Sequence, residues 1–114
     1  MAKDYKAITQ DISEYTRELA KLSPDAMKAF YALARSASAD GAIGKKTKEL
    51  IALSIGVTQR CDGCIGFHAK ALHELGASRE EVAEAMAMCV YMGGGPALMY
   101  AADALRAYDE LVAA

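Results

Sequence analysis

The chain has 114 residues, of which 54% are hydrophobic, and a formal net charge of −2. This length predicts a single domain over residues 1–114, and the slightly acidic balance excludes the basic surface that nucleic-acid binding needs. The apolar fraction exceeds the roughly 45–50% usual for soluble domains, so we expect some of it to be buried between subunits.

The N-terminal sequence MAKDYKAITQD is charged and lacks the apolar core of a signal peptide, which favours a cytoplasmic protein. No uninterrupted apolar run reaches the roughly 20 residues that a membrane-spanning helix needs, so we expect no contact with a membrane. From residue 5 onward, apolar residues recur at helical spacing and predict a first helix over 5–22, with a stripe made of Ile8, Ile12, Tyr15, Leu19 and Leu22.

Two more helices are expected before the middle of the chain. Ser23 and Pro24 are typical of an N-cap followed by the first helical residue, and they open a helix over 24–38. We expect this helix to bury one face, formed by Met27, Phe30, Leu33 and Ala34. After the turn-rich stretch SADGAIG, a third helix over 45–57 is apolar around most of its circumference. Such a helix belongs in the middle of a bundle, so we expect burial of Leu50, Ile51 and Leu53.

The second half of the chain predicts three further helices. The fourth runs from Cys61 to Leu75 and is followed by a glycine suited to ending it. Ser78 opens the fifth, with Glu81 three positions on as a capping box. The stretch GGGP ends that helix, and a sixth follows to about Leu111. No period-two run indicates a strand, so the predicted fold class is all-α with about six helices.

Two cysteines and a histidine stand close together in the stretch RCDGCIGFHAKAL. With Cys61 at the start of the fourth helix, Cys64 lies at i+3 and His68 at i+7, so all three occupy one stripe. Backbone N–H groups at a helix N-terminus stabilise a thiolate, and an imidazole one turn later can take or deliver a proton. In a reducing compartment a CxxC pair is more often catalytic, redox-active or metal-binding than structural. The trio therefore favours thiol redox chemistry.

Zinc is the main alternative for the same residues, beside an inert structural CxxC pair. Structural zinc takes four ligands, and the only other candidates are His73 and Cys89. His73 is five residues past His68, about 140° around the helix, so it points elsewhere. Cys89 lies in the apolar stretch EAMAMCVYM, where we expect a small buried residue. A c-type haem needs histidine directly after the second cysteine, and that position is Ile65. We therefore expect no metal and no cofactor.

Glu49 is the one further residue that this chemistry could draw on. It lies in the stretch KELIALSIG, where burial of a carboxylate costs free energy unless it has a partner. One interpretation leaves Glu49 exposed at the helix start beside three lysines. The other makes it the base that orients His68 or exchanges protons with it. The residues alone leave both interpretations open.

The chain resembles the carboxymuconolactone decarboxylase family, and within it the alkylhydroperoxidase D-like branch. The resemblance covers roughly residues 20–110 and rests on ELIALSIGVTQRCDGCIGFHAKALHELGASREEVAEAM, where a glutamate precedes a CxxC motif by twelve residues and a histidine follows it by four. GGGPALMYAADAL also resembles the glycine turn and helix that come next in the family. The resemblance implies an alkylhydroperoxidase D-like helical bundle.

It also implies a mechanism. In peroxidase-type members, the second cysteine of the motif attacks the peroxide and becomes a sulfenic acid. The first cysteine resolves it to a disulfide, which a lipoyl or thioredoxin-type dithiol reduces. Carried onto this chain, Cys64 is the peroxidatic thiol, Cys61 the resolving thiol, and His68 with Glu49 the proton relay. The expected function is that of a thiol-dependent peroxidase or disulfide reductase acting on small hydroperoxides.

One position departs from the best-studied peroxidase members, which carry a further histidine between the two cysteines. Here that position is Gly63, so the resemblance implies a slower peroxidase. Small members of the family assemble as rings, which implies a homo-oligomer, either a hexamer or a trimer. Two other functions remain open: a decarboxylase-like enzyme acting on a small lactone, which shares the histidine and glutamate without depending on a CxxC pair, and a non-enzymatic redox-sensing oligomer.

Overall fold

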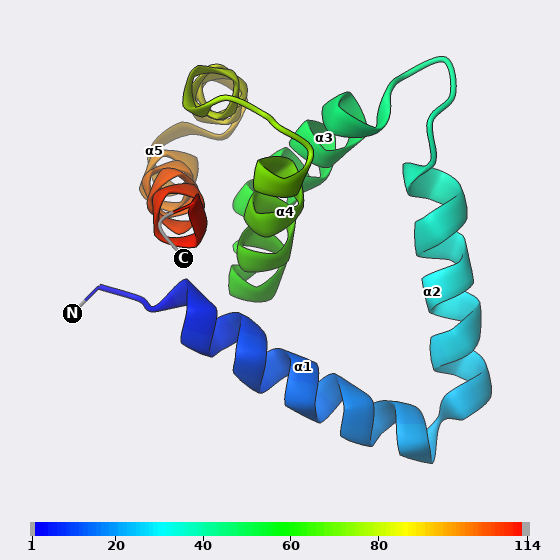
Figure 1. Cartoon of the computed structure of the whole chain (residues 1–114). Coiled ribbons are helices and arrows are strands. Elements are labelled where there is room, and N and C mark those ends of the chain that lie inside the picture. The colour runs from blue at the N-terminus through cyan, green and yellow to red at the C-terminus, as the bar shows by residue number, and fades with distance from the viewer. Residues whose placement is uncertain (1, 113–114) are drawn as a thin grey trace.

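The computed structural model describes residues 2–112 and builds them from five α-helices, with no strand in that range (Figure 1). The all-α prediction is confirmed, and the bounds of the first four helices lie within one residue of those expected. The helices are α1 (Tyr5–Leu22), α2 (Pro24–Ser38), α3 (Lys45–Thr58), α4 (Asp62–Glu74) and α5 (Arg79–Val112).

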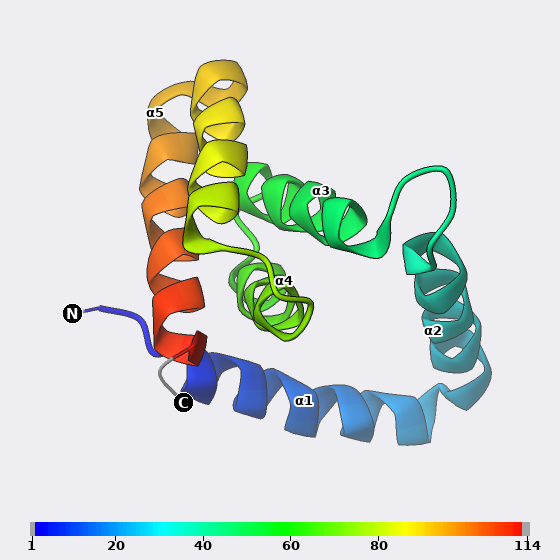
Figure 2. The same ribbon diagram turned by 45° about the horizontal axis from the view of Figure 1, so that its top comes forward.

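The expected fifth and sixth helices form one element, α5, which turns back on itself at Gly94 (Figure 2). Gly94 has φ 72°, a conformation that glycine adopts without steric cost. Arg79 and Asp109 prove the reversal, because their side chains form an ion pair with an Nε–Oδ1 distance of 2.9 Å. In a straight helix, 30 residues would separate them by about 45 Å. The expected fifth and sixth helices are thus both present, as a first half (79–93) and a second half (95–112) that share the label α5.

This turn also bears on the membrane expectation. By length and composition alone, α5 is apolar enough to cross a bilayer, and no other helix within residues 2–112 meets that test. The reversal at Gly94 leaves each half shorter than the roughly 20 residues that a span needs. Both halves instead belong to a helical hairpin that packs against α3 and α4.

The start of α5 carries the capping box that the sequence predicts. Glu81 N–H donates to Ser78 Oγ at 3.1 Å, and Ser78 N–H donates to Glu81 Oε1 at 2.9 Å. The Ser78 N–H bond and the ion pair with Lys46 hold the pKa of the Glu81 carboxyl below its usual value. The two reciprocal bonds satisfy backbone donors that the helix itself cannot.

Replacing Ser78 with alanine is expected to lower the free energy of unfolding by about 1 kcal/mol, because one backbone N–H loses its acceptor. Chemical denaturation followed by circular dichroism measures the change. Ser36→Ala, at an exposed serine inside α2, serves as the control and should leave the midpoint nearly unchanged. Equal midpoints for both variants would show that the box contributes nothing to stability.

The core lies where α3, α4 and α5 pack together, with the beginning of α1 laid across α4 (Figure 1). Tyr5 is fully buried there, and Gly66 of α4 allows the close approach of α1. A Cβ on Gly66 would lie 2.5 Å from Thr9 Cγ2. The fully buried aliphatic side chains of the core come from three helices and are Leu53, Val57, Ile65, Leu72 and Val82.

The burial expected for α2 is wrong for the single chain. No residue of α2 is buried: Met27 is half-buried, while Phe30 and Leu33 are 58% and 64% exposed. Among the helices of residues 2–112, α2 packs only against α1 and α3, so nothing covers its apolar face. Helix α3 is also less buried than predicted, because the other helices of this chain do not cover its whole circumference. Leu53 is buried, Leu50 is half-buried and Ile51 is 45% exposed.

Candidate functional site

The two cysteines of the CxxC motif lie at the N-terminus of α4. Cys61 is the N-cap residue and Cys64 lies in the first turn, with Cα atoms 5.3 Å apart and the sulfurs joined as a disulfide. Cys64 N–H donates to Cys61 Sγ at 3.2 Å. The cap therefore brings a sulfur into direct contact with one of the unpaired N–H groups of the helix end, where a thiolate is stabilised. Both side chains are half-buried, which leaves a path for a small reagent.

Gly56 of α3 determines how closely the two helices meet at this point. It is buried, and a Cβ placed on it would lie only 2.9 Å from Cys64 Cβ. Sequence reasoning missed this residue. Its signal was a glycine in the interior of an otherwise apolar helix, which often marks close packing of another element.

Replacing Gly56 with alanine is expected to destabilise the fold by about 1–3 kcal/mol, because α3 and α4 must move apart at Cys64. Thermal unfolding measures the loss. Gly95→Ala is the matched control, since a Cβ there meets no atom within 4 Å. That substitution should be neutral or slightly stabilising. An unchanged Gly56→Ala protein would mean that the contact gives way at no cost.

Glu49 and His68 meet across the same pair of helices. His68 Nδ1 lies 2.6 Å from Glu49 Oε2, joining α4 to α3. The Glu49 residue is 9% exposed, so the structure supports the interpretation in which it is buried with a partner and not the one at an exposed helix start. Since a carboxylate only accepts, His68 Nδ1–H is the donor in this bond. The His68 side chain is 34% exposed, so its ring remains open to a reagent.

The turn between the cysteines is held from outside by the N-terminal segment. Lys3 Nζ lies 2.9 Å from Asp62 Oδ1 and 3.0 Å from Asp103 Oδ2, linking the CxxC turn to the second half of α5. The bond to Asp62 is the largest of the effects that raise the pKa of the Lys3 ammonium. Next to Asp62, Gly63 faces α1, because a Cβ there would lie 2.8 Å from Ile12 Cδ1. A histidine at position 63 would need that isoleucine to move.

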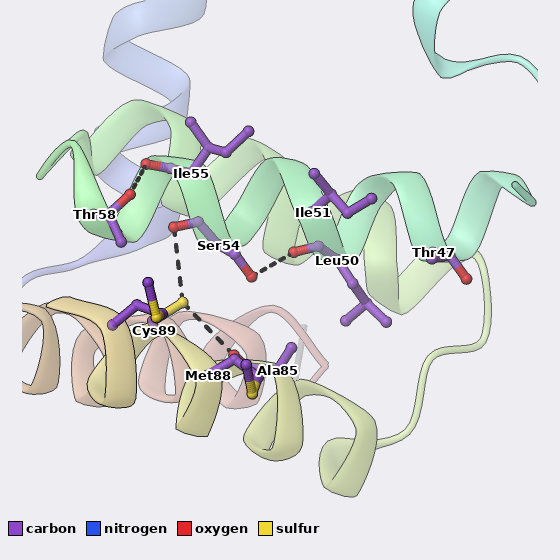
Figure 3. Close-up of a pocket in the computed structure, with 10 residues that line it drawn as sticks. Thr47, Leu50, Ile51, Ser54, Ile55, Thr58, Ala85, Met88 and Cys89 are labelled. Carbon is purple, nitrogen blue, oxygen red and sulfur yellow. Dashed lines mark hydrogen bonds between the residues drawn. The ribbon is translucent and has the colours of Figure 1, made fainter.

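The other metal-ligand candidates lie apart from this site. His73 packs its ring edge-on against Tyr108, with centroids 6.2 Å apart. Cys89 is a free, buried thiol between α5 and α3, with its sulfur 3.8 Å from Ser54 O and 3.6 Å from Ala85 O (Figure 3). Within residues 2–112, no three or more His, Cys, Asp or Glu side chains gather as a metal site would require. The four residues predicted from the sequence thus form two close pairs, Cys61 with Cys64 and Glu49 with His68.

Comparison with known proteins gives a family for this arrangement. A sequence model of the carboxymuconolactone decarboxylase family matches residues 24–107. An uncharacterised protein of Cupriavidus necator is 38% identical over 111 residues, covering 97% of this chain and 98% of its own length. An uncharacterised protein of Haemophilus influenzae is 39% identical, covering 96% of each chain.

A solved structure has the same fold. The apo form of lpg0406, a carboxymuconolactone decarboxylase family protein from Legionella pneumophila, superposes with a TM-score of 0.93 at 50% sequence identity. The likeness covers 95% of this chain and 96% of that one.

Proposed function

The chain belongs to the carboxymuconolactone decarboxylase family, and we propose that this member is a thiol-dependent peroxidase or disulfide reductase acting on small hydroperoxides. The observation that carries the proposal is the part-buried Glu49–His68 hydrogen bond of 2.6 Å, one helical turn from a cysteine pair at the N-terminus of α4. A lactone decarboxylase has no use for a redox-active pair, which makes peroxide chemistry the better explanation of Cys61 and Cys64. The need for reduced thiols favours the cytoplasm.

In the oxidative step, the Cys64 thiolate attacks the terminal oxygen of the hydroperoxide. The O–O bond breaks, a sulfenic acid forms on Cys64, and the alkoxide leaves as an alcohol once it takes a proton. Sulfur is oxidised by two electrons and the peroxide is reduced by two. The backbone N–H groups at the α4 N-terminus stabilise the thiolate before the attack.

The disulfide then closes within one turn of helix. The Cys61 sulfur attacks the Cys64 sulfenic sulfur, an S–S bond forms, and hydroxide leaves as water after protonation. The Cα separation of 5.3 Å lies in the range that a disulfide spans, so closure needs little backbone movement. A dithiol of the lipoyl or thioredoxin type reduces the pair again by exchange, giving up two electrons and two protons.

His68 and Glu49 supply the protons. With Nδ1–H donating to the Glu49 carboxylate, the neutral imidazole is held in one tautomer and has Nε2 available to exchange a proton. Nε2 takes the proton as the Cys64 thiol ionises and delivers it to the leaving oxygen. The Glu49 carboxylate stabilises the imidazolium between these events, which is the role of a carboxylate behind a catalytic histidine.

The test is steady-state consumption of cumene hydroperoxide or hydrogen peroxide by the reduced protein, with dithiothreitol or dihydrolipoamide as donor. We expect saturable turnover that depends on both peroxide and dithiol, slower than in members with a histidine at the position of Gly63. Thiol titration before and after one equivalent of peroxide should show the loss of two thiols per chain. Oxidation of both thiols without repeated turnover would favour the redox sensor, and no oxidation at all would overturn the proposal.

A further inference from the structure

One charged residue, Asp62, stands between the two cysteines of the CxxC motif. It is the acidic residue of the first turn of α4, where the partial positive charge of a helix N-terminus favours a carboxylate. The same helix end must also stabilise the thiolate that forms when the disulfide is reduced. Because a carboxylate and a thiolate carry like charges, each disfavours the ionised form of the other. Asp62 therefore opposes the chemistry of its two neighbours unless a cation offsets its charge.

Lys3 is the cation that offsets it. Its Nζ lies 2.9 Å from Asp62 Oδ1, and within residues 2–112 no other basic side chain pairs with Asp62. Two groups of the second half of α5 hold the lysine in place, since its Nζ lies 3.0 Å from Asp103 Oδ2 and 4.8 Å from the ring centroid of Tyr100. Asp103 has a second cation in Arg106. The Lys3 charge is therefore left to balance Asp62.

The surroundings of the Lys3–Asp62 pair make its charges effective. The two side chains are 35% and 38% exposed, and the Asp103 side chain beside them is 15% exposed. Charges at a partly buried site are screened less by salt than charges on an open surface. The bond to Asp62 also raises the pKa of the Lys3 ammonium, which therefore stays protonated over the whole range in which thiols titrate. Lys3 thus offsets the Asp62 charge at every pH that matters for the cysteines.

We propose that Lys3 is a positioning residue for the CxxC pair, which fixes and neutralises the Asp62 carboxylate so that the reduced pair can hold a thiolate. The inference rests on the proposed function only in taking Cys61 and Cys64 as a redox pair, and its test needs no peroxide. Lys3 lies before residues 24–107, which match the family model, so the contact comes from outside that part of the chain. The segment before α1 thereby tunes a site that α3 and α4 build.

Other charged and titratable groups surround this end of α4 and act on the thiols as well. They come from α1, α3, α4, the second half of α5 and the turn before Cys61, and they are Tyr5, Glu49, His68, Tyr100, Asp103, Arg106 and Arg60. None of them is altered in the variants below. A change in the thiol pKa between those variants therefore reports on Lys3 and Asp62.

Replacing Lys3 with methionine is expected to raise the lower of the two thiol pKa values by about half a unit, because Asp62 then acts on the thiolate without its cation. Ultraviolet absorbance of the thiolate, followed against pH at low ionic strength, measures the pKa. At about pH 8, the equilibrium with dithiothreitol should shift about threefold toward the protein disulfide, the factor that half a pKa unit gives. In that equilibrium the protein disulfide gains two electrons and two protons, which dithiothreitol gives up as it closes to a ring disulfide.

Three further variants show whether Lys3 acts through Asp62. Lys3→Arg keeps the positive charge and should retain the wild-type thiol pKa, whereas Asp62→Asn removes the opposing carboxylate and should lower it. Combining Lys3→Met with Asp62→Asn removes both charges of the pair and should return the pKa close to that of the wild type. Lys28→Met is the control, at an exposed lysine of α2, which packs against α1 and α3. Circular dichroism verifies that all variants are equally helical.

A Lys3→Met protein with the wild-type thiol pKa and dithiothreitol equilibrium would overturn the proposal, even if it unfolded more easily. Lys3 would then only tie the segment before α1 to the rest of the fold. A double variant shifted as far as Lys3→Met alone would equally reject it, because Lys3 would then act without Asp62. A wild-type protein that shows these shifts but turns over no peroxide would contradict the proposed function and leave the role of Lys3 in place.

Discussion

Cys64→Ser protein is expected to lose all peroxide-dependent turnover, down to the rate of dithiol and peroxide in buffer. The proposed cycle begins with nucleophilic attack by the Cys64 thiolate, and a serine hydroxyl neither ionises at neutral pH nor accepts oxygen from a peroxide. The fold should be retained, since serine replaces one atom at a half-buried helix start. Peroxide consumption measured with and without dithiol gives the result, and circular dichroism verifies the fold.

Cys61→Ser is the matched variant, because it removes the other sulfur of the same helix turn. We expect it to react once with peroxide and then stop, leaving a sulfenic acid on Cys64 that dimedone traps and mass spectrometry locates. Its backbone geometry should persist, since a serine at the N-cap also accepts the Cys64 N–H. If the trapped sulfenic acid were found on residue 61 in Cys64→Ser protein instead, the order of the two sulfurs would be reversed.

The helix bounds could be predicted because local chemistry determines them. Ser23 with Pro24 opens α2, and the Ser78–Glu81 box opens α5 with both of its predicted bonds. The turn at Gly94 was also visible as GGGP. The two helical halves on either side of Gly94 correspond to the fifth and sixth helices that the sequence predicts.

Burial could be predicted less well, because it depends on which surfaces meet. The stripe on α2 is as regular as any in the chain, yet Phe30 and Leu33 are exposed since no helix of the same chain reaches them. Glu49 shows the opposite case, in which a residue with an equally good solvent-exposed interpretation is buried by a partner 19 positions away. The residues alone left that pairing as one of two open interpretations, and the family resemblance favoured it. Periodicity gives the faces of a helix and leaves open what covers them.

Neither periodicity nor the family resemblance was enough to assign Gly56 and Ile12 to the site. Gly56 lies against Cys64, and Ile12 covers Gly63 between the two cysteines. Both contacts join helices that are distant in the sequence, so neither could follow from spacing within the CxxC motif. They explain why this turn is tightly enclosed on two sides while the histidine side stays open.

Glu49→Gln is expected to lower the rate of Cys64 oxidation by about 100-fold, near the lower end of what acid–base catalysis contributes. Glutamine keeps the shape of the side chain and an oxygen that can accept the His68 Nδ1–H, but it cannot stabilise an imidazolium by charge. Exchanging a charged acceptor for a neutral one at a distance of 2.6 Å should cost only about 1 kcal/mol of stability. Stopped-flow measurement of thiol loss after mixing with peroxide gives the rate.

The oxidation rate and the unfolding free energy of Glu49→Gln together distinguish a proton relay from a purely structural Glu49–His68 pair. If Glu49 only held the helices together, Glu49→Gln would lower the unfolding free energy and leave the oxidation rate of the folded protein unchanged. Glu84→Gln, at an exposed glutamate of α5, removes the same charge from the molecule and should alter neither quantity. A relay further predicts that the rate lost in Glu49→Gln depends on pH, because the imidazole must still gain and lose a proton in each cycle without the carboxylate behind it. A slow variant with the pH profile of the wild type would contradict that role and leave Glu49 as a positioning residue for His68.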